Sequence, residues 1–198
     1  MQIQVESLER TLKAKSTDRS ALKDITQKIF QASRVINYFA EAQHLLKKRN
    51  RSKTVDVGAA VDRAIFQLAW NLERRGFPIK PDIKWERDSN RSYPVKTTLH
   101  ILDLVIAELL ENAVVFGDGA VTIALHDTGK TISLHISNHG NLTPNEVKVA
   151  LTQFESSGDN AGAGLGLHLV QVFAAAVGGT FQISSKQGTV TVVLELKK

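Results

Sequence analysis

The sequence contains no cysteine, which excludes disulfides, thiolate metal sites and cysteine nucleophiles. No apolar run approaches the roughly 20 residues that span a bilayer. The first residues carry acidic side chains and lack an apolar block, so they do not form a signal peptide. We therefore expect no membrane contact by this chain and a cytoplasmic location.

Basic residues are dispersed along the chain, although its formal net charge is +5. The exception is one short stretch, which favours the end of a solvated helix, with cations near the carbonyl end of the dipole, over a nucleic-acid patch. We expect no nucleic-acid partner. The stretch consists of Lys47, Lys48, Arg49, Arg51 and Lys53.

The first 50 residues contain neither proline nor glycine and carry an apolar seam. From Leu22 to Phe39 apolar residues alternate at spacings of 3 and 4, and Leu46 continues the register. This seam predicts a helix over residues 17–48 that packs against other helices. A shorter seam before it suggests a helical hairpin over residues 1–52. Pairing with a second copy into a four-helix bundle gives a homodimer; packing on the chain's own second domain is the alternative.

Residues 53–198 alternate between helical and strand patterns. They predict an α+β fold, with helices packed on one face of a mixed β-sheet. Asp127, Thr128 and Gly129 indicate a hairpin turn, and Thr143 to Glu146 form a capping box that starts a helix. The predicted helices cover 57–75, 95–116, 143–154 and 166–177, and the predicted strands cover 78–86, 120–126, 131–137, 180–185 and 189–196.

A carboxylate and a carboxamide lie one turn apart in the predicted helix 95–116. Glu108 and Asn112 are four residues apart and share a face. Such polar groups on an apolar helix cost desolvation unless something uses them. Asn112 could hold Mg²⁺, which prefers oxygen ligands shared with substrate phosphates. Glu108 could orient or deprotonate the group that attacks a γ-phosphate. Ordinary solvent contacts at the rim of the sheet explain the pair equally well.

Two glycine-containing segments are candidates for ligand contact. Residues 162–167, Gly-Ala-Gly-Leu-Gly-Leu, precede an amphipathic helix, where backbone N–H groups can bind phosphate. They do not follow a strand, so the dinucleotide fingerprint does not apply, and no P-loop string is present. Residues 137–140, Ser-Asn-His-Gly, follow a strand and could read the edge of a flat ring. A flexible loop and a plain turn are the respective alternatives.

The order of these pieces resembles one family. The Glu-Leu-Leu-Glu-Asn-Ala helix, the strand hairpin, Ser-Asn-His-Gly, the Gly-Ala-Gly-Leu-Gly-Leu loop and the final strand pair are together similar to the ATP-binding domain of bacterial sensor histidine kinases. Gyrase-type topoisomerases, Hsp90-type chaperones and anti-sigma-factor kinases share this fold. The resemblance covers residues 54–198. It implies a dimerisation hairpin over residues 1–52 and an ATP-binding catalytic domain over residues 53–198.

The resemblance implies a role for each matching position. Asn112 matches the Mg²⁺-binding asparagine, and Glu108 matches the position of a general base or polarising residue in many members. Asn138 occupies the place of the acidic residue that binds adenine, and Gly140 belongs to the same segment. The other nucleotide-binding positions are the aromatic before the lid (155–161), the phosphate-side loop and a threonine near the base: Phe154, Gly162, Gly164, Leu165, Gly166 and Thr189.

Three positions depart from the family pattern. Asn138 replaces the usual Asp; its amide oxygen can still accept from the adenine amino group, but without charge assistance. Leu142 stands where a second glycine is common. Val115 stands where many kinases have a phosphate-contacting lysine. These departures predict weak affinity or a degenerate domain.

The acceptor histidine of the family has no match in this sequence. The segment 17–48 resembles the second helix of the dimerisation domain, whereas the acceptor belongs to the first helix, so we expect the acceptor ahead of Met1. None of the six histidines has the required sequence context, and each is expected to be structural or on the surface: His44, His100, His126, His135, His139 and His168.

Three functions follow from the resemblance. The leading one is the catalytic part of a two-component sensor histidine kinase, which transfers the ATP γ-phosphoryl to a histidine, with Mg²⁺ as cofactor and a response regulator receiver domain as partner. The chain would then be the cytoplasmic part of a larger sensor. A degenerate regulator or phosphotransfer partner is the second. An anti-sigma-type serine kinase, which shares Glu108 and Asn112 but lacks the helical hairpin, is the third.

Overall fold

The computed structural model describes residues 33, 40, 53–74, 80–85, 91–151 and 166–198. Of the first 52 residues it describes Ser33 and Ala40, both helical, so the predicted hairpin otherwise lies outside the described residues. No helix among the described residues is long and apolar enough to cross a bilayer. The elements are β1 (Lys53–Asp56), α3 (Val57–Arg74), β2 (Asp82–Trp85), β3 (Pro94–Thr97), α4 (Leu99–Phe116), β4 (Ala120–Asp127), β5 (Thr131–His139), α5 (Pro144–Leu151), α6 (Gly166–Ala176), β6 (Thr180–Lys186) and β7 (Thr189–Lys197).

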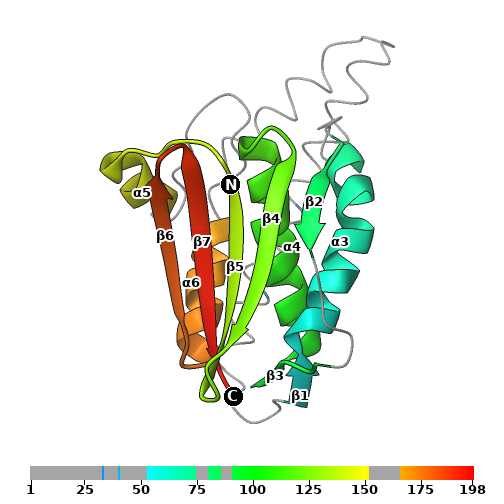
Figure 1. Cartoon of the computed structure of the whole chain (residues 1–198). Helices are drawn as coiled ribbons and strands as arrows, with labels where there is room; N and C mark the ends of the chain where they lie inside the picture. Colours follow the sequence, from blue (N-terminus) through cyan, green and yellow to red (C-terminus); the bar gives the residue numbers. More distant parts are fainter. Residues whose placement is uncertain (1–32, 34–39, 41–52, 75–79, 86–90, 152–165) are drawn as a thin grey trace, which may run out of the picture.

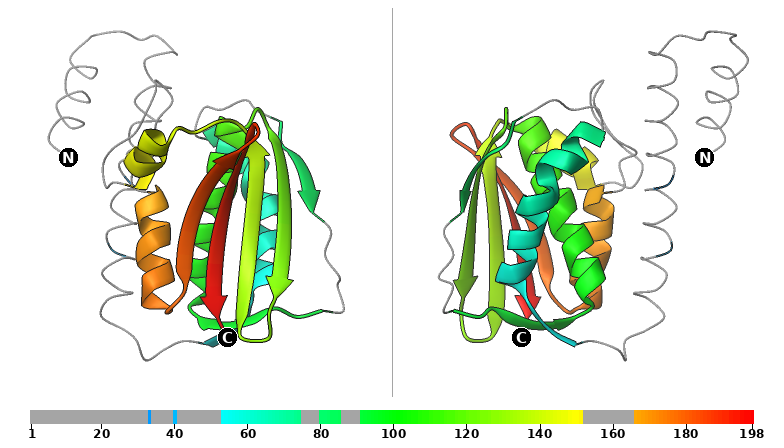
Figure 2. Two further views of the ribbon diagram at one scale, coloured as in Figure 1. Left: turned by 60° about the vertical axis from the view of Figure 1, so that its left-hand side comes forward. Right: turned by 90° about the vertical axis from the view of Figure 1, so that its right-hand side faces the viewer.

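A five-stranded sheet forms one layer, and α3, α4 and α6 cover one of its faces (Figures 1 and 2). The strand order is β2-β4-β5-β7-β6. β2 runs parallel to β4, and the other neighbours are antiparallel. The prediction of an α+β fold with helices on one face of a mixed sheet is confirmed.

The core lies between this sheet and α4. Alternate residues of β5, namely Ile132, Leu134 and Ile136, are buried toward the helices, as expected for a strand with one covered face. α4 packs between α3 and α6 as well as on β4 and β5. It is therefore buried on nearly all sides, through Ile101, Leu102, Val105, Ile106, Leu109, Leu110, Ala113 and Val114.

The beginning of the domain differs from the sequence prediction. Residues 95–97 were expected in the helix that ends at Phe116, but they belong to β3, which pairs antiparallel with β1. Val95 and Thr97 are β-branched and both buried, which suits a strand, and Pro94 occupies the first strand position, where its missing N–H is tolerated. The apolar pattern of β3 runs directly into that of α4, so periodicity did not separate them.

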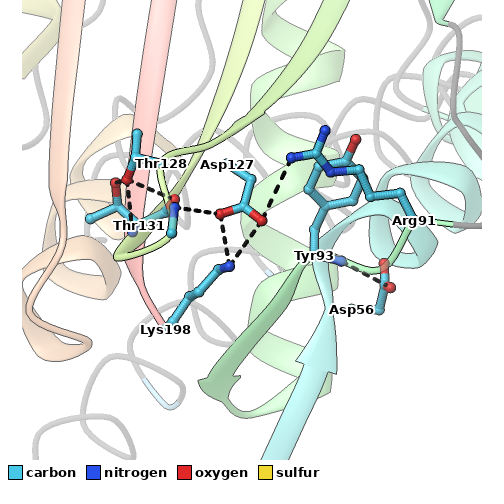
Figure 3. A network of polar contacts seen from close by, with 8 residues as sticks. Asp56, Arg91, Tyr93, Asp127, Thr128, Thr131 and Lys198 are labelled. Carbon is cyan, nitrogen blue, oxygen red and sulfur yellow. Dashed lines mark hydrogen bonds and ion pairs between the residues drawn. The ribbon is translucent and has the colours of Figure 1, made fainter.

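Two aspartates form hydrogen bonds and ion pairs at the end of the domain where the β4–β5 hairpin turns (Figure 3). Asp56 caps α3 by accepting from the Ala59 N–H at 2.9 Å, and it also accepts from Tyr93 N–H at 3.2 Å. Asp127 accepts from Lys198 Nζ, with 2.7 Å to the nearer oxygen, while Arg91 lies 3.8 Å away. The Lys198 hydrogen bond and then the Gly129 N–H hold the pKa of Asp127 below its ordinary value.

The predicted capping box starts α5. The N–H and the hydroxyl of Thr143 donate to Glu146 at 2.7 and 2.8 Å, and the Glu146 N–H donates back to the hydroxyl at 3.3 Å. These bonds, the backbone one first, lower the pKa of Glu146. The helix continues to Leu151, and the predicted end at Phe154 lies outside the described residues.

The other face of the sheet carries polar side chains, with a pair of histidines. The rings of His126 on β4 and His135 on β5 meet edge to face, with centroids 4.7 Å apart. Burial, and then the charge of His126, lower the pKa of His135 from 6.5, while Glu195 on β7 acts in the opposite direction. The structure therefore favours neutral His135.

His135→Gln should weaken the pH dependence of stability. Because the pKa of His135 is lower in the folded chain, the unfolded chain binds more protons as the pH falls below its ordinary value. We expect the unfolding temperature to fall between about pH 7.5 and about pH 5.5, and to fall less in His135→Gln. The carboxylates Asp127 and Glu146, whose pKa values are lowered, lose their contribution at more acidic pH. Scanning fluorimetry at both pH values provides the measurement; an equal fall in both proteins would contradict it.

Candidate functional site

The C-terminal ends of α4 and β5 lie close together, at the end of the sheet opposite the β4–β5 turn (Figure 1). Gly117, which follows α4, packs directly on Asn138 of β5. A Cβ at Gly117 would lie 2.5 Å from the Ala113 carbonyl oxygen and 2.7 Å from Nδ2 of Asn138. Glycine is therefore required here because of the close contact. Its backbone conformation does not require glycine, since φ is an ordinary −120°.

Asn138 is a buried polar side chain at this junction. It is 9% exposed and lies on the helix-covered face of the sheet, two residues after Ile136. Its Nδ2 donates to the carbonyl oxygen of His139 at 2.7 Å. No hydrogen-bond partner of Oδ1 occurs among the described residues, so this oxygen is an available acceptor.

Gly140 and Thr189 lie beside Asn138. The Gly140 N–H donates to the Gly188 carbonyl oxygen at 3.0 Å, which ties the loop after β5 to the β6–β7 turn. Thr189 begins β7 directly opposite His139 in the strand register. Gly140 has a φ of +153°, which a side chain rarely adopts. The structure thus brings together the three residues that the sequence linked to a flat ring.

Glu108 and Asn112 lie one turn apart on α4, before Gly117. Asn112 is half-buried, and Glu108 is 4% exposed. At about 1.5 Å per residue, Asn112 lies roughly 7 Å and Glu108 roughly 13 Å back along the helix axis from Gly117. This spacing is of the order of the length of an extended nucleoside triphosphate.

The phosphate-side residues are described only in part. Phe154, Gly162, Gly164 and Leu165 lie outside the described residues, and Gly166 is the first residue of α6. α6 packs beside α4 and has no acidic residue in its first turn, so its N-terminus favours an anion.

Phe116 was missed by the sequence argument. It ends α4 beside Gly117, and its side chain is 57% exposed, unusual for a large aromatic residue. Its backbone oxygen lies 3.7 Å from the position of a Cβ at Gly140. In the sequence it continued the apolar pattern of the helix; its place directly before a glycine that ends the helix was the available signal.

Residues 98–198, just over half of the chain, match the family of histidine kinase-, DNA gyrase B- and HSP90-like ATPases. The chain belongs to this family. No curated protein matches it significantly. The predicted resemblance to sensor histidine kinases is confirmed by the family and by the folds of solved structures.

Three solved structures illustrate the shared fold: those of the histidine kinases AdeS and ThkA, and that of ShkA. Acinetobacter baumannii AdeS is 17% identical with a TM-score of 0.76, covering 98% of this chain and 94% of that one. Full-length ShkA in complex with AMPPNP is 19% identical with a TM-score of 0.66, covering 94% and 41%. ThkA in complex with its response regulator TrrA is 18% identical with a TM-score of 0.67, covering 99% and 57%. At these identities the likeness concerns the fold.

The residues present suit a nucleotide of this ATPase family. Oδ1 of Asn138 can accept a hydrogen bond from an amino group, and Phe116 offers an exposed ring. The described residues contain no group of three or more metal-ligating side chains. A metal ion held by Asn112 would therefore need oxygen ligands from a phosphate chain, which is how Mg²⁺ is usually bound.

Gly117→Ala should lower the free energy of unfolding by about 1–3 kcal/mol, because the added methyl group overlaps Asn138 and the end of α4. Gly129→Ala is the comparison variant. Its Cβ meets no atom within 4 Å, but its φ of +87° costs a side chain about 1 kcal/mol. Urea unfolding measures both. A smaller loss for Gly117→Ala than for Gly129→Ala would contradict the close contact.

Proposed function

We propose that residues 53–198 bind ATP with Mg²⁺ and form the catalytic domain of a two-component sensor histidine kinase, which transfers the γ-phosphoryl group to a histidine outside this chain. The observation that carries the proposal is the available Asn138 acceptor, beside Gly117 and Gly140, in a member of this ATPase family. The AMPPNP in the ShkA complex supports a nucleotide as the ligand.

The nucleotide is proposed to lie along α4. The base lies against Phe116 and meets Oδ1 of Asn138, with Gly140 and Thr189 at its border. Stacking on an exposed aromatic ring contributes about 1–3 kcal/mol for nucleobases. The phosphates extend back along α4 toward Asn112 and toward the N-terminus of α6, together with the glycines of residues 162–166.

Asn112 and Glu108 are proposed to serve the phosphates. The side-chain oxygen of Asn112 would be the protein ligand of Mg²⁺. A bound Mg²⁺ would supply positive charge beside the phosphates, and Asn112 would hold it there. Glu108 would orient the acceptor imidazole and hold its proton at the carboxylate. Their spacing of four residues on α4 places both side chains on one helix face.

The remaining assignments also belong to this proposal. Residues 1–52 form the dimerisation hairpin, and a response regulator receiver domain is the phosphoryl acceptor downstream, as the ThkA–TrrA complex suggests. The chain acts in the cytoplasm as part of a larger sensor.

Asn112→Asp and Glu108→Gln separate binding from transfer. Asn112→Asp adds a negative charge near the triphosphate, so Mg-ATP binding should weaken roughly tenfold. Glu108→Gln keeps the shape and removes the carboxylate, so binding should persist while transfer falls about 10²–10⁴-fold. Calorimetry measures binding, and phosphoryl transfer is measured in a longer chain that contains the acceptor histidine.

Ligand-induced stabilisation provides the control for this comparison. A ligand that binds the native state raises the unfolding temperature, so the unsubstituted chain and Glu108→Gln should both be stabilised by Mg-ATP. No stabilisation of the unsubstituted chain at millimolar Mg-ATP would refute the proposed function. Unchanged phosphoryl transfer in both variants would show that Glu108 and Asn112 do not belong to the active site.

The seam in residues 17–48 should make the chain a homodimer. Ile29→Asp would bury an unpaired charge at the seam and should cost several kcal/mol of dimer stability, on the order of 3–5. Gln27→Asp, off the seam, is the matched control and should leave the dimer intact. Light scattering at tens of micromolar measures the mass; a value near the chain mass of 21.7 kDa for the unsubstituted protein would contradict the dimer.

A degenerate domain is the second candidate, and Val115 favours it. This residue, where a phosphate-contacting lysine is common, packs against the hydrophobic core. Binding of Mg-ATP without any phosphoryl transfer in the longer chain would favour this second candidate.

A further inference from the structure

Two histidines and a glutamate surround Ser133 on the face of the sheet opposite the helices. In the strand register, Ser133 lies between His126 of β4 and Glu195 of β7. His135 follows two residues later on β5 and therefore points to the same face. Ser133 is only 5% exposed, although no helix-covered residue of β5 shares its face. The larger side chains of its neighbours therefore cover this serine.

The two imidazole rings are spaced as two ligands of one metal ion would be. The ring centroids of His126 and His135 are 4.7 Å apart, and the ring planes meet at 82°. With metal–nitrogen bonds of about 2.0–2.1 Å, two imidazoles at adjacent positions of one ion have ring centres roughly 4.5–5.2 Å apart. The last side-chain torsion of histidine is soft, so each ring can turn a nitrogen toward a common point.

Glu195 places a carboxylate beside the histidine pair. Its two oxygens accept from Oγ of Ser133 at 3.3 Å and from Oγ1 of Thr180 at 2.9 Å. Lys197, the next residue of β7 on this face, has its ammonium nitrogen 3.8 Å from the position of a Cβ at Gly178. The hydroxyl groups thus hold the negative charge of Glu195 at the centre of the sheet, while the ammonium of Lys197 lies beside the end of α6.

The protonation state of His135 suits metal binding. Burial, and then the charge of His126, lower the pKa of His135, although Glu195 acts in the opposite direction. A neutral imidazole has a nitrogen lone pair that a metal can use, whereas an imidazolium has none. Because the sequence contains no cysteine, no thiolate of this chain competes for the same ion.

We propose that His126 and His135 together bind a divalent transition-metal ion such as Zn²⁺ or Cu²⁺, with Glu195 as a neighbouring carboxylate and water at the remaining positions. The described residues contain no group of three or more metal-ligating side chains, so the two imidazoles are the protein ligands. Imidazole suits these ions, whereas Mg²⁺ prefers oxygen. The site is separate from the proposed nucleotide site, because Asn138 lies on the other face of the sheet.

Calorimetry with Zn²⁺ tests the site in the full chain without an affinity tag. The unsubstituted chain should bind Zn²⁺, and excess Mg²⁺ should not displace it. His126→Gln and His135→Gln each remove one ligand and should weaken binding at least about tenfold. His139→Gln is the matched control, since this histidine lies on the same strand and face, four residues after His135, and it should bind as the unsubstituted chain does.

Three results would overturn the proposal. The first is no binding of Zn²⁺ by the unsubstituted chain at tens of micromolar, and the second is displacement of Zn²⁺ by excess Mg²⁺. The third is equal affinity in His126→Gln, His135→Gln and His139→Gln, which would assign the ion to other side chains. None of these results affects the proposed function, because binding of Mg-ATP is measured separately.

Glu195→Gln tests the contribution of the carboxylate. Removing one negative charge beside a divalent cation should weaken Zn²⁺ binding by roughly three- to tenfold. Unchanged affinity would overturn the part of the proposal that concerns Glu195.

Electron paramagnetic resonance of the unsubstituted chain, with less than one equivalent of Cu²⁺, counts the nitrogen ligands without any substitution. Two imidazole nitrogens should be bound to the ion. This measurement decides if a variant does not fold, as checked by circular dichroism; one nitrogen or none would overturn the proposal.

Discussion

Burial of α4 on nearly all sides is the constraint on which the rest of the domain depends. A helix with Leu102, Ile106, Leu109 and Leu110 fully or almost fully buried cannot face water, and each such side chain contributes about 1.5–3 kcal/mol when removed from it. The sheet, α3 and α6 supply the cover, so their positions follow from the surface of α4. Its two ends are exposed, at Leu99 in the first turn and at Phe116 in the last. Glu108 and Asn112 thus stand on a helix that packs against the sheet, α3 and α6, which suits functional groups that need fixed geometry.

The sequence predicted most of this arrangement because the long elements have strong periodicity and the capping box of α5 is local. It failed for β3, where Val95 joins the apolar pattern of α4 without a break and where pairing with β1 decides the conformation. The exposure of Phe116 was not predicted for a related reason. An apolar residue at the end of a helix fits the apolar periodicity of the sequence whether its side chain is buried or exposed. The sequence could not predict the orientation of the Asn138 amide. This orientation depends on the carbonyl oxygen of His139 and on Gly117, which is distant in sequence.

The two main departures from the family pattern have different physical consequences. Val115 replaces a long cation by an apolar side chain that packs on the core, which removes a charge from the phosphate side. Asn138 replaces a carboxylate by an amide, yet it keeps an acceptor and gains a bond to its neighbour. Under the proposed function, the first change concerns the phosphates and the second concerns the base. A weakly active member with intact base selection is physically consistent.

The position of β7 in the sheet constrains how the domain is made. β7 comes last along the described chain but lies between β5 and β6, and its Leu194 and Leu196 are buried. Before β7 joins the sheet, β5 and β6 each have an edge without its neighbouring strand. Such edges are prone to pairing with other chains, and partly folded chains of this kind aggregate readily. Pairing of β7 with both neighbours therefore removes these two exposed edges at once.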